Sequence, residues 1–270
     1  ATGRLTSASV GAPTTLGGND LEGVARIDAL GEILTSDESG PHIRRYGWPG
    51  GAAVGAVAVP AVFANARNNL SLESLAWDPT TERLWTANEE ALAGDGPIAS
   101  FVAGTTVRLQ RFDAALQADG QWPYPPDSLP GDIQPPGRDI EASGVTELIA
   151  LPDGGLLALE RAVGGGAAIR HRLYEVDISV ASDSSAVPTL DGAAFTPAAK
   201  ELLWEGSLLF TNLEGAALGR MLDDGSRSLL LVSDNGGGLN QVLYALRLRP
   251  LVCGDGIAGG SEECDDGNTE

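Results

Sequence analysis

The sequence predicts an all-β fold of the β-propeller class, with five or six blades. The first observation is an internal repeat, because segments built alike as strand, turn and strand recur four times along the chain. The second is that no window of 12 or more residues keeps an apolar helical face without interruption by Gly or Pro. The third is the length of 270 residues, with 43% hydrophobic residues, which allows one large all-β domain with a core of its own.

The four predicted hairpins each consist of a short apolar stretch, a turn rich in Asp, Gly, Pro or Thr, and a second apolar stretch. They occupy residues 21–40, 72–91, 145–163 and 213–237. Their leading glutamates are Glu22, Glu73, Glu147 and Glu214, which lie 51, 74 and 67 residues apart. Such spacing fits propeller blades with long connections between them.

Further strand candidates between the hairpins supply the outer strands of each blade. They are residues 56–63, 105–112, 170–178, 201–204 and 241–248. The proline-dense segment 120–144 can be neither a central strand nor a helix. We expect it to be a long ordered loop, either a lid over the channel mouth or a surface excursion.

The charge balance excludes several kinds of partner. The chain has 37 acidic against 17 basic residues and a formal net charge of −20, so nucleic acid and anionic membranes are repelled. No run of about 18 apolar residues predicts a membrane span. We expect a monomer that is secreted or held at the cell surface, with any signal peptide already removed before Ala1.

Repeated carboxylates predict a metal site. The innermost strand of each blade lines the central channel, so the four leading glutamates converge there. The second strand of each hairpin also ends in oxygen-bearing side chains: Glu38, Glu89, Glu160, and Asp234 with Asn235. Gathered carboxylates repel one another unless a cation is bound. Oxygen ligands favour Ca²⁺, with Mg²⁺ as the second choice. The alternative is that these acids cap turns or lie on solvated strand ends.

A calcium ion in an open channel supports hydrolysis without a Ser-His-Asp triad. The chain has two histidines, and neither lies in a GxSxG or HExxH motif. His42 follows the acidic end of the first hairpin and is a candidate catalytic residue. Arg161 is a second candidate, which either pairs with Glu160 or holds an anionic oxygen of the substrate.

The segments NDLEGVARI, SLESLAWDP, GVTELIALPDGG and NLEGAALG, within residues 19–248, together resemble the family called esterase-like activity of phytase. The resemblance implies a propeller that hydrolyses esters or phosphoesters. It also implies nine metal-site candidates: Glu22, Glu38, Glu73, Glu89, Glu147, Glu160, Glu214, Asp234 and Asn235. Members of the family usually carry another hairpin ahead of the DLEG-like segment, whereas here 18 residues precede Asn19.

The scarcity of basic residues also bears on the substrate. A highly anionic molecule such as phytate would need basic contacts or several cations, so a neutral ester, lactone or phosphotriester is easier to bind. We therefore expect a calcium-dependent hydrolase of small esters or phosphoesters. Two alternatives stay open. One is a lactonase of the gluconolactonase and paraoxonase type, and the other is a non-catalytic, calcium-stabilised surface propeller.

The two cysteines, Cys253 and Cys264, both lie in the last eighteen residues. We therefore expect two parts, a propeller domain over residues 1–250 and a second part over 251–270. The second part looks like the start of a cysteine-rich repeat of secreted and surface proteins of myxobacteria. Because that repeat stops part-way, we expect the natural protein to be longer.

Overall fold

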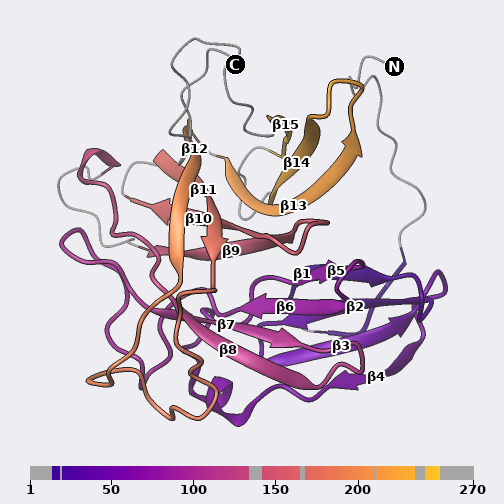
Figure 1. The fold of residues 1–270 in the computed structure, drawn as a ribbon, viewed down its shortest axis with the longest axis horizontal. Helices are drawn as coiled ribbons and strands as arrows, with labels where there is room; N and C mark the ends of the chain where they lie inside the picture. The colour runs from indigo at the N-terminus through magenta and orange to yellow at the C-terminus, as the bar shows by residue number, and fades with distance from the viewer. Residues whose placement is uncertain are drawn as a thin grey trace, which may run out of the picture.

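The protein is built from four antiparallel sheets that follow one another along the chain (Figure 1). The computed structural model describes residues 14–18, 20–133, 142–164, 168–209, 211–234 and 241–249. Blade 1 contains β1 (Leu21–Ile27), β2 (Glu32–Asp37), β3 (His42–Gly47) and β4 (Ala53–Val57). Blade 2 contains β5 (Ala76–Asp78), β6 (Arg83–Ala87), β7 (Val107–Phe112) and β8 (Ala118–Tyr124). Blade 3 contains β9 (Ala142–Ala150), β10 (Leu156–Val163), β11 (Ala168–Asp177) and β12 (Ala199–Leu209). Blade 4 contains β13 (Asn212–Met221), β14 (Arg227–Asp234) and β15 (Leu243–Leu248).

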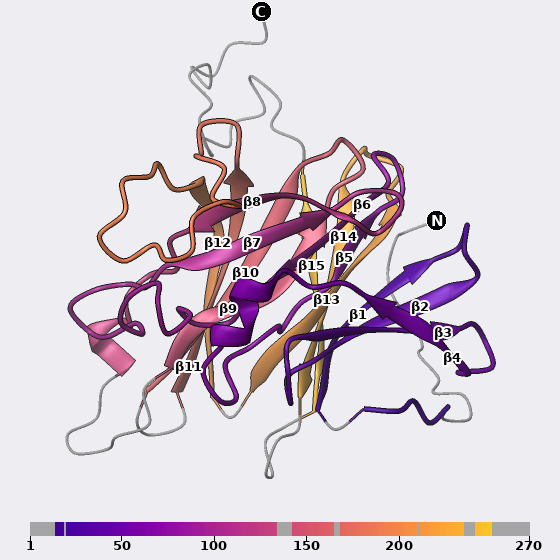
Figure 2. The ribbon, with the colours of Figure 1, turned by 90° about the horizontal axis from the view of Figure 1, so that it is seen from below.

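Each blade is a meander in which neighbouring strands pair in chain order. The first strands of the blades, β1, β5, β9 and β13, lie nearest the common centre, as the two perpendicular views show (Figures 1 and 2). Two short 3₁₀ helices, η1 (Ala61–Asn65) and η2 (Gly131–Ile133), lie in connections outside the sheets. The arrangement therefore presents four inner strands to one channel.

Three apolar cores join successive blades. The first packs Leu34 and Ile43 of blade 1 against Leu84 of blade 2. The second packs Trp85, Trp122 and other side chains of blade 2 against blade 3, and the third joins Leu159 and Leu173 of blade 3 to Leu229 and Leu231 of blade 4. Strand alternation explains this packing, because successive side chains point to opposite faces of a sheet. Each middle blade can therefore contact both of its neighbours.

Blades 1 and 4 each have one face without such a core in the part of the chain that the structure describes. On β1, Ala25 and Ile27 face blade 2, while Val24 on the opposite face is 60% exposed. On β14, Val232 lies on the face away from blade 3 and is 43% exposed. The ring is therefore open between blade 4 and blade 1 across the described residues.

The predicted all-β propeller class is confirmed, and all four predicted hairpins form. The described residues form four sheets, against the five or six blades expected. The predicted strand at 56–63 is wrong for most of its length: β4 ends at Val57 and η1 follows, whereas β3 was not predicted. Residues 120–124, expected to lie in a loop, belong to β8, where Pro123 is tolerated because β8 is the outer edge of its sheet.

Two other predicted segments lie wholly or partly outside the described residues. Residues 134–141 of the proline-rich segment and the whole cysteine-bearing part from residue 251 onward lie outside the described residues, whereas residues 142–144, expected to lie in the loop, begin β9. Among the residues that are described, no helix combines the length and the apolar character that crossing a membrane requires.

Candidate metal-binding and active site

A cavity of about 370 Å³ lies where the inner strands begin, and we call it the acidic cavity. All four blades or their connections contribute to its walls. Its lining residues are Asp20, Leu21, Glu22, Glu38, Asn69, Glu73, Glu89, Arg161, Glu214 and Asp234. Seven carboxylates therefore face a single guanidinium group. The structure thus brings together most of the residues that the sequence predicted.

Strand register explains why the glutamates of blades 1 and 2 converge. Leu21 pairs with Asp37 in blade 1, and Leu72 pairs with Asn88 at the same position of blade 2. Glu22 and Glu73 each follow the first member of these pairs, and Glu38 and Glu89 each follow the second. The repeated sequence pattern therefore places four carboxylates at one end of two neighbouring inner strands.

Two glycines allow the inner strands to approach closely at this end. A Cβ atom on Gly23 of β1 would lie 2.4 Å from the backbone N of Leu75 in the next blade. A Cβ atom on Gly144 of β9 would lie 2.2 Å from the backbone O of Glu89. Both separations are far shorter than a van der Waals contact, so any larger residue would push the blades apart. These glycines therefore set the width of the acidic cavity.

The carboxylates form two groups that share one member. Ligand oxygens of Asp20, Glu22 and Glu38 lie within 4.8 Å of one another, and so do those of Glu38, Glu73 and Glu89. The shared Glu38 is fixed by the next blade, because its Oε1 accepts the Ser71 backbone N–H at 2.8 Å. Glu38, Glu73 and Glu89 are all buried.

Burial and mutual repulsion raise the pKa values of these acids. Burial, followed by the charges of Glu214 and Glu38, raises the pKa of Glu22 to about 7. Burial also places the pKa of Glu73 well above its usual value, and Glu89 adds to the effect. The pKa of Glu89 is likewise raised by burial, although Arg161 opposes the change. Without a cation, Glu22, Glu73 and Glu89 therefore hold their protons more strongly than free carboxyl groups do.

Arg161 is the one cation that lines the acidic cavity among the described residues. Its guanidinium donates to Glu89 and Glu214, and its Nη1 also donates to Asn212 Oδ1 at 3.0 Å. Burial disfavours its charge, but Glu89 and Glu214 outweigh burial and raise its pKa. The predicted pairing with Glu160 is wrong, because adjacent residues of a strand point to opposite faces. Arg161 instead bridges Glu89 of blade 2 and Glu214 of blade 4.

Glu147 does not line the acidic cavity, although the sequence placed it in line with Glu22. The pair Gly144 and Arg161 in blade 3 corresponds to the pair Leu21 and Asp37 in blade 1. Val145, which follows Gly144, therefore occupies the position that corresponds to Glu22. Glu147 lies two residues further along its strand. Its buried carboxylate accepts backbone N–H groups of Leu148, Ala216 and Leu75, and burial raises its pKa well above the usual value. Glu147 therefore links blade 3 to blades 2 and 4 by hydrogen bonds to their backbones.

Glu160 also lies elsewhere. Its carboxylate accepts hydrogen bonds from Tyr124 Oη at 2.7 Å, Lys200 Nζ at 2.6 Å and the backbone of Asp127 at 2.9 Å. These contacts join blade 2 to blade 3 away from the acidic cavity. The cause is again register, because Arg161 rather than Glu160 occupies the level of Asp37 and Asn88.

The remaining predicted residues are placed as follows. His42 is exposed at the start of β3, opposite Asp37, and is absent from the lining of the acidic cavity. Asp234 lies at the end of β14 and does line it. Asn235 lies outside the described residues. The candidate catalytic role of His42 thus has no geometric support in this arrangement.

Sequence reasoning missed three polar residues near the cavity: Asp20, Asn69 and Asn212. Asp20 and Asn212 each precede a Leu-Glu-Gly step, in NDLEG and TNLEG, so the repeat itself carried a signal for both. Asn69 lines the cavity from a connection, with a positive φ of 57°, and no repeat marks its position.

The donor set fits a hard divalent cation. Every charged ligand atom of the two carboxylate groups is an oxygen, and neither group includes a histidine or a cysteine. Ca²⁺ takes six to eight oxygen ligands in flexible geometry. The raised pKa values show the electrostatic cost of gathering these groups without such a charge. Asp20, Glu22, Glu38, Glu73 and Glu89 are therefore the residues suited to hold it.

Comparisons with known proteins give one broad match. Residues 2–237 match the phytase-like family described as "Esterase-like activity of phytase". No curated protein matches the chain.

Solved structures give distant likenesses. Endo-arabinase from Bacteroides thetaiotaomicron VPI-5482 is 17% identical with a TM-score of 0.40, over 85% of this chain and 74% of that chain. The PQQ-bound aldose sugar dehydrogenase from Streptomyces coelicolor is 13% identical with a TM-score of 0.34, over 88% and 97%. A luciferin-regenerating enzyme is 14% identical with a TM-score of 0.34, over 88% and 80%. Because the identities and TM-scores are this low, the fold is described from the strand pairing of this chain and not from these structures.

Proposed function

The chain belongs to the phytase-like family, esterase-like activity of phytase, and we propose on that premise that it is a calcium-dependent hydrolase of small ester or phosphoester substrates. The observation that carries the proposal is the acidic cavity, which seven carboxylates and the half-buried Arg161 line among the described residues. A bound Ca²⁺ would polarise the ester or phosphoryl oxygen and lower the pKa of a water molecule. Asp20, Glu22, Glu38, Glu73 and Glu89 would hold it.

Arg161 and Glu214 have separate roles in this proposal. Glu89 and Glu214 hold the guanidinium of Arg161 in the cavity wall, where it can orient an oxygen of the substrate. Glu214 Oε1 accepts from both Arg161 and Asn212, while Oε2 accepts no hydrogen bond from the described residues. Burial raises the pKa of Glu214, which makes its carboxylate a stronger base. We assign Glu214 Oε2 as the acceptor of the proton of the attacking water.

The charge of the cavity favours neutral substrates. Asp20, Glu22 and Asp234 lie at its more exposed positions and would repel a polyanion even with one cation bound. A neutral aryl ester, lactone or phosphotriester meets no such repulsion. An extracellular or cell-surface location, which we also propose, would supply calcium at the high concentrations that surface modules use.

The test is turnover of an aryl ester, a phosphotriester and a lactone with and without a chelator. Chelation should abolish turnover and added Ca²⁺ should restore it. Glu73→Gln should lower kcat/KM at least about 100-fold, whereas Glu175→Gln, at an exposed position on β11, should leave it unchanged. Chelator-resistant activity, or full activity of Glu73→Gln, would contradict the proposal.

Glu214→Gln separates the base from the metal ligands. It should lower kcat by about 100-fold or more while calcium affinity changes less than about threefold. A calcium-stabilised protein without turnover on any substrate class would instead indicate a non-catalytic propeller.

A further inference from the structure

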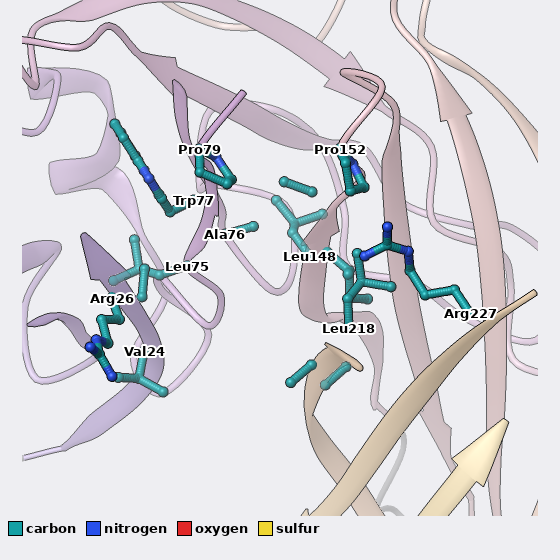
Figure 3. A pocket seen from close by; sticks show the side chains of 15 residues that line it. Val24, Arg26, Leu75, Ala76, Trp77, Pro79, Leu148, Pro152, Leu218 and Arg227 are labelled. Atoms are coloured by element: carbon teal, nitrogen blue, oxygen red, sulfur yellow. The ribbon is translucent and has the colours of Figure 1, made fainter. Parts of the chain in front are cut away.

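A second cavity, of about 290 Å³, lies along the same inner strands beyond the acidic cavity (Figure 3). We call it the apolar cavity. On β1 its lining begins at Val24, two residues after Glu22, and on β13 at Ala216, two residues after Glu214. In blade 2 it begins at Leu75, two residues after Glu73. The two cavities therefore occupy successive levels of one channel.

Glu147 separates these two levels. Its carboxylate accepts the N–H groups of Leu75, Leu148 and Ala216, and all three residues line the apolar cavity. Most side chains that line it are aliphatic or aromatic, with Val24, Trp77, Pro152 and Leu218 among them (Figure 3), but it is open to solvent, where Val24 is 60% exposed, and backbone and guanidinium groups add polar surface. The apolar cavity therefore differs in chemistry from the acidic cavity and does not share its carboxylates.

Two arginines interrupt the apolar lining, Arg26 and Arg227. Arg26 is paired, because its Nε donates to Asp28 at 2.6 Å. Arg227 projects from β14 toward the side of the cavity formed by Leu148 and Pro152 (Figure 3). It makes no ion pair or hydrogen bond with a side chain in the described part of the chain.

The exposed Arg220 also has no carboxylate partner, but among the half-buried arginines of the described residues Arg227 alone donates no side-chain hydrogen bond and forms no ion pair. Carboxylates outnumber basic residues 37 to 17, and even the partly exposed Arg44, Arg111 and Arg247 have carboxylate partners. Arg227 is half-buried and borders aliphatic side chains. A partly desolvated guanidinium without an internal partner is suited to an external anion.

We propose that the apolar cavity binds a small amphiphilic monoanion, with its hydrocarbon part among the inner-strand side chains and its carboxylate on Arg227. The size limits the ligand to a small molecule, because about 290 Å³ lies at the lower edge of the roughly 300–1,000 Å³ of small-molecule sites. An alkanoate of about eight carbons or a phenylalkanoate fits these limits. A polyanion does not, because Arg227 offers one unpaired charge on a protein of net charge −20.

The test is isothermal titration of the whole protein with octanoate, 1-octanol and octyltrimethylammonium. Octanoate should bind with a Kd below about 1 mM, and the cationic analogue should bind at least about tenfold more weakly. Arg227→Met keeps the apolar stem and removes the charge, so it should weaken octanoate at least about tenfold and leave octanol within about threefold. Arg220→Met removes an equal charge from an exposed position on β13 and should change neither affinity.

The opposite results would overturn the inference. One such result is no octanoate binding at an octanoate concentration tenfold above the expected Kd. The others are equal affinity for octanoate and octyltrimethylammonium, and unchanged octanoate affinity in Arg227→Met. The comparison of the two head groups uses the wild-type protein, so it stands even if the variant fails to fold. Glu73→Gln should keep full octanoate affinity, which separates this site from the hydrolytic site proposed above.

Discussion

The carboxyl groups of Glu22, Glu73 and Glu89 lie in surroundings that penalise their negative charge. Burial is the largest cause for each of them, and neighbouring acids add to it. Arg161 offsets part of the rise in the pKa of Glu89. The two carboxylate groups themselves contain no cation among the described residues. The residues of the acidic cavity therefore favour either bound protons or a bound cation, and the two compete.

This competition gives a pH prediction for the metal-free protein. The pKa of Glu22 is about 7 in the fold against an ordinary value of 4.5, so between these values the folded state binds more protons than the unfolded state. Stability in chelator should therefore fall as pH rises from about 4.5 through 7. Calcium should raise the melting temperature by more at pH 8 than at pH 5, by at least about 3 °C.

The contribution of Glu22 can be isolated by a difference between two proteins. His171 titrates in the same range with the opposite sign, because burial lowers its pKa to about 3. The melting curves of wild type and Glu22→Gln in chelator should therefore diverge across this window, with the variant relatively more stable at high pH. Parallel curves would show that folding does not raise the pKa of Glu22 in the metal-free protein, which would contradict this prediction.

At the scale of elements, the inner strands are joined by contacts of two kinds. Gly23 and Gly144 let backbones approach at the acidic level, and Glu147 ties β9 to β13 and to the residue preceding β5 one level further along. A carboxylate with three backbone donors is costly to replace, since each donor left unpaired in the interior loses about 1–3 kcal/mol. Glu147 thus holds strands in place rather than facing the acidic cavity.

Glu147→Ala should therefore lower the free energy of unfolding by about 3 kcal/mol in urea denaturation. Calcium affinity of the folded variant should change less than about threefold, because Glu147 is outside the acidic cavity. Glu175→Ala, on the exposed face of β11, serves as the control and should change stability by less than about 0.5 kcal/mol. If Glu147→Ala kept its stability but bound calcium more weakly, Glu147 would be a metal ligand and this prediction would be wrong.

At the scale of the whole molecule, three cores connect four blades in chain order, and the described residues do not join blade 4 to blade 1 by a fourth. The channel between the inner strands is nevertheless lined by all four blades at both levels. The open side explains why Val24 and Val232 are exposed on sheets whose other faces are buried. Packing and the channel wall are therefore shared, since Leu75 and Leu148 belong to apolar cores and also line the apolar cavity.

The hairpin repeat predicted the class of fold, because apolar stretches and turn residues are local signals. It also placed Glu22, Glu38, Glu73 and Glu89, since the strand register of blades 1 and 2 follows the sequence spacing. It misplaced Glu147, because in blade 3 the level of Leu21 is taken by Gly144, three residues before Glu147. Such an offset depends on pairing between strands and leaves no trace in the spacing of one hairpin.

We propose that the acidic cavity binds calcium. The most direct measurement is an anomalous difference map from a crystal grown with Ca²⁺. We expect a peak about 2.3–2.6 Å from carboxylate oxygens of Glu38 and Glu73, and we expect this peak to be lost in Glu73→Gln. A map at saturating calcium without a peak in the acidic cavity, or with peaks confined to other acidic surfaces, would contradict it.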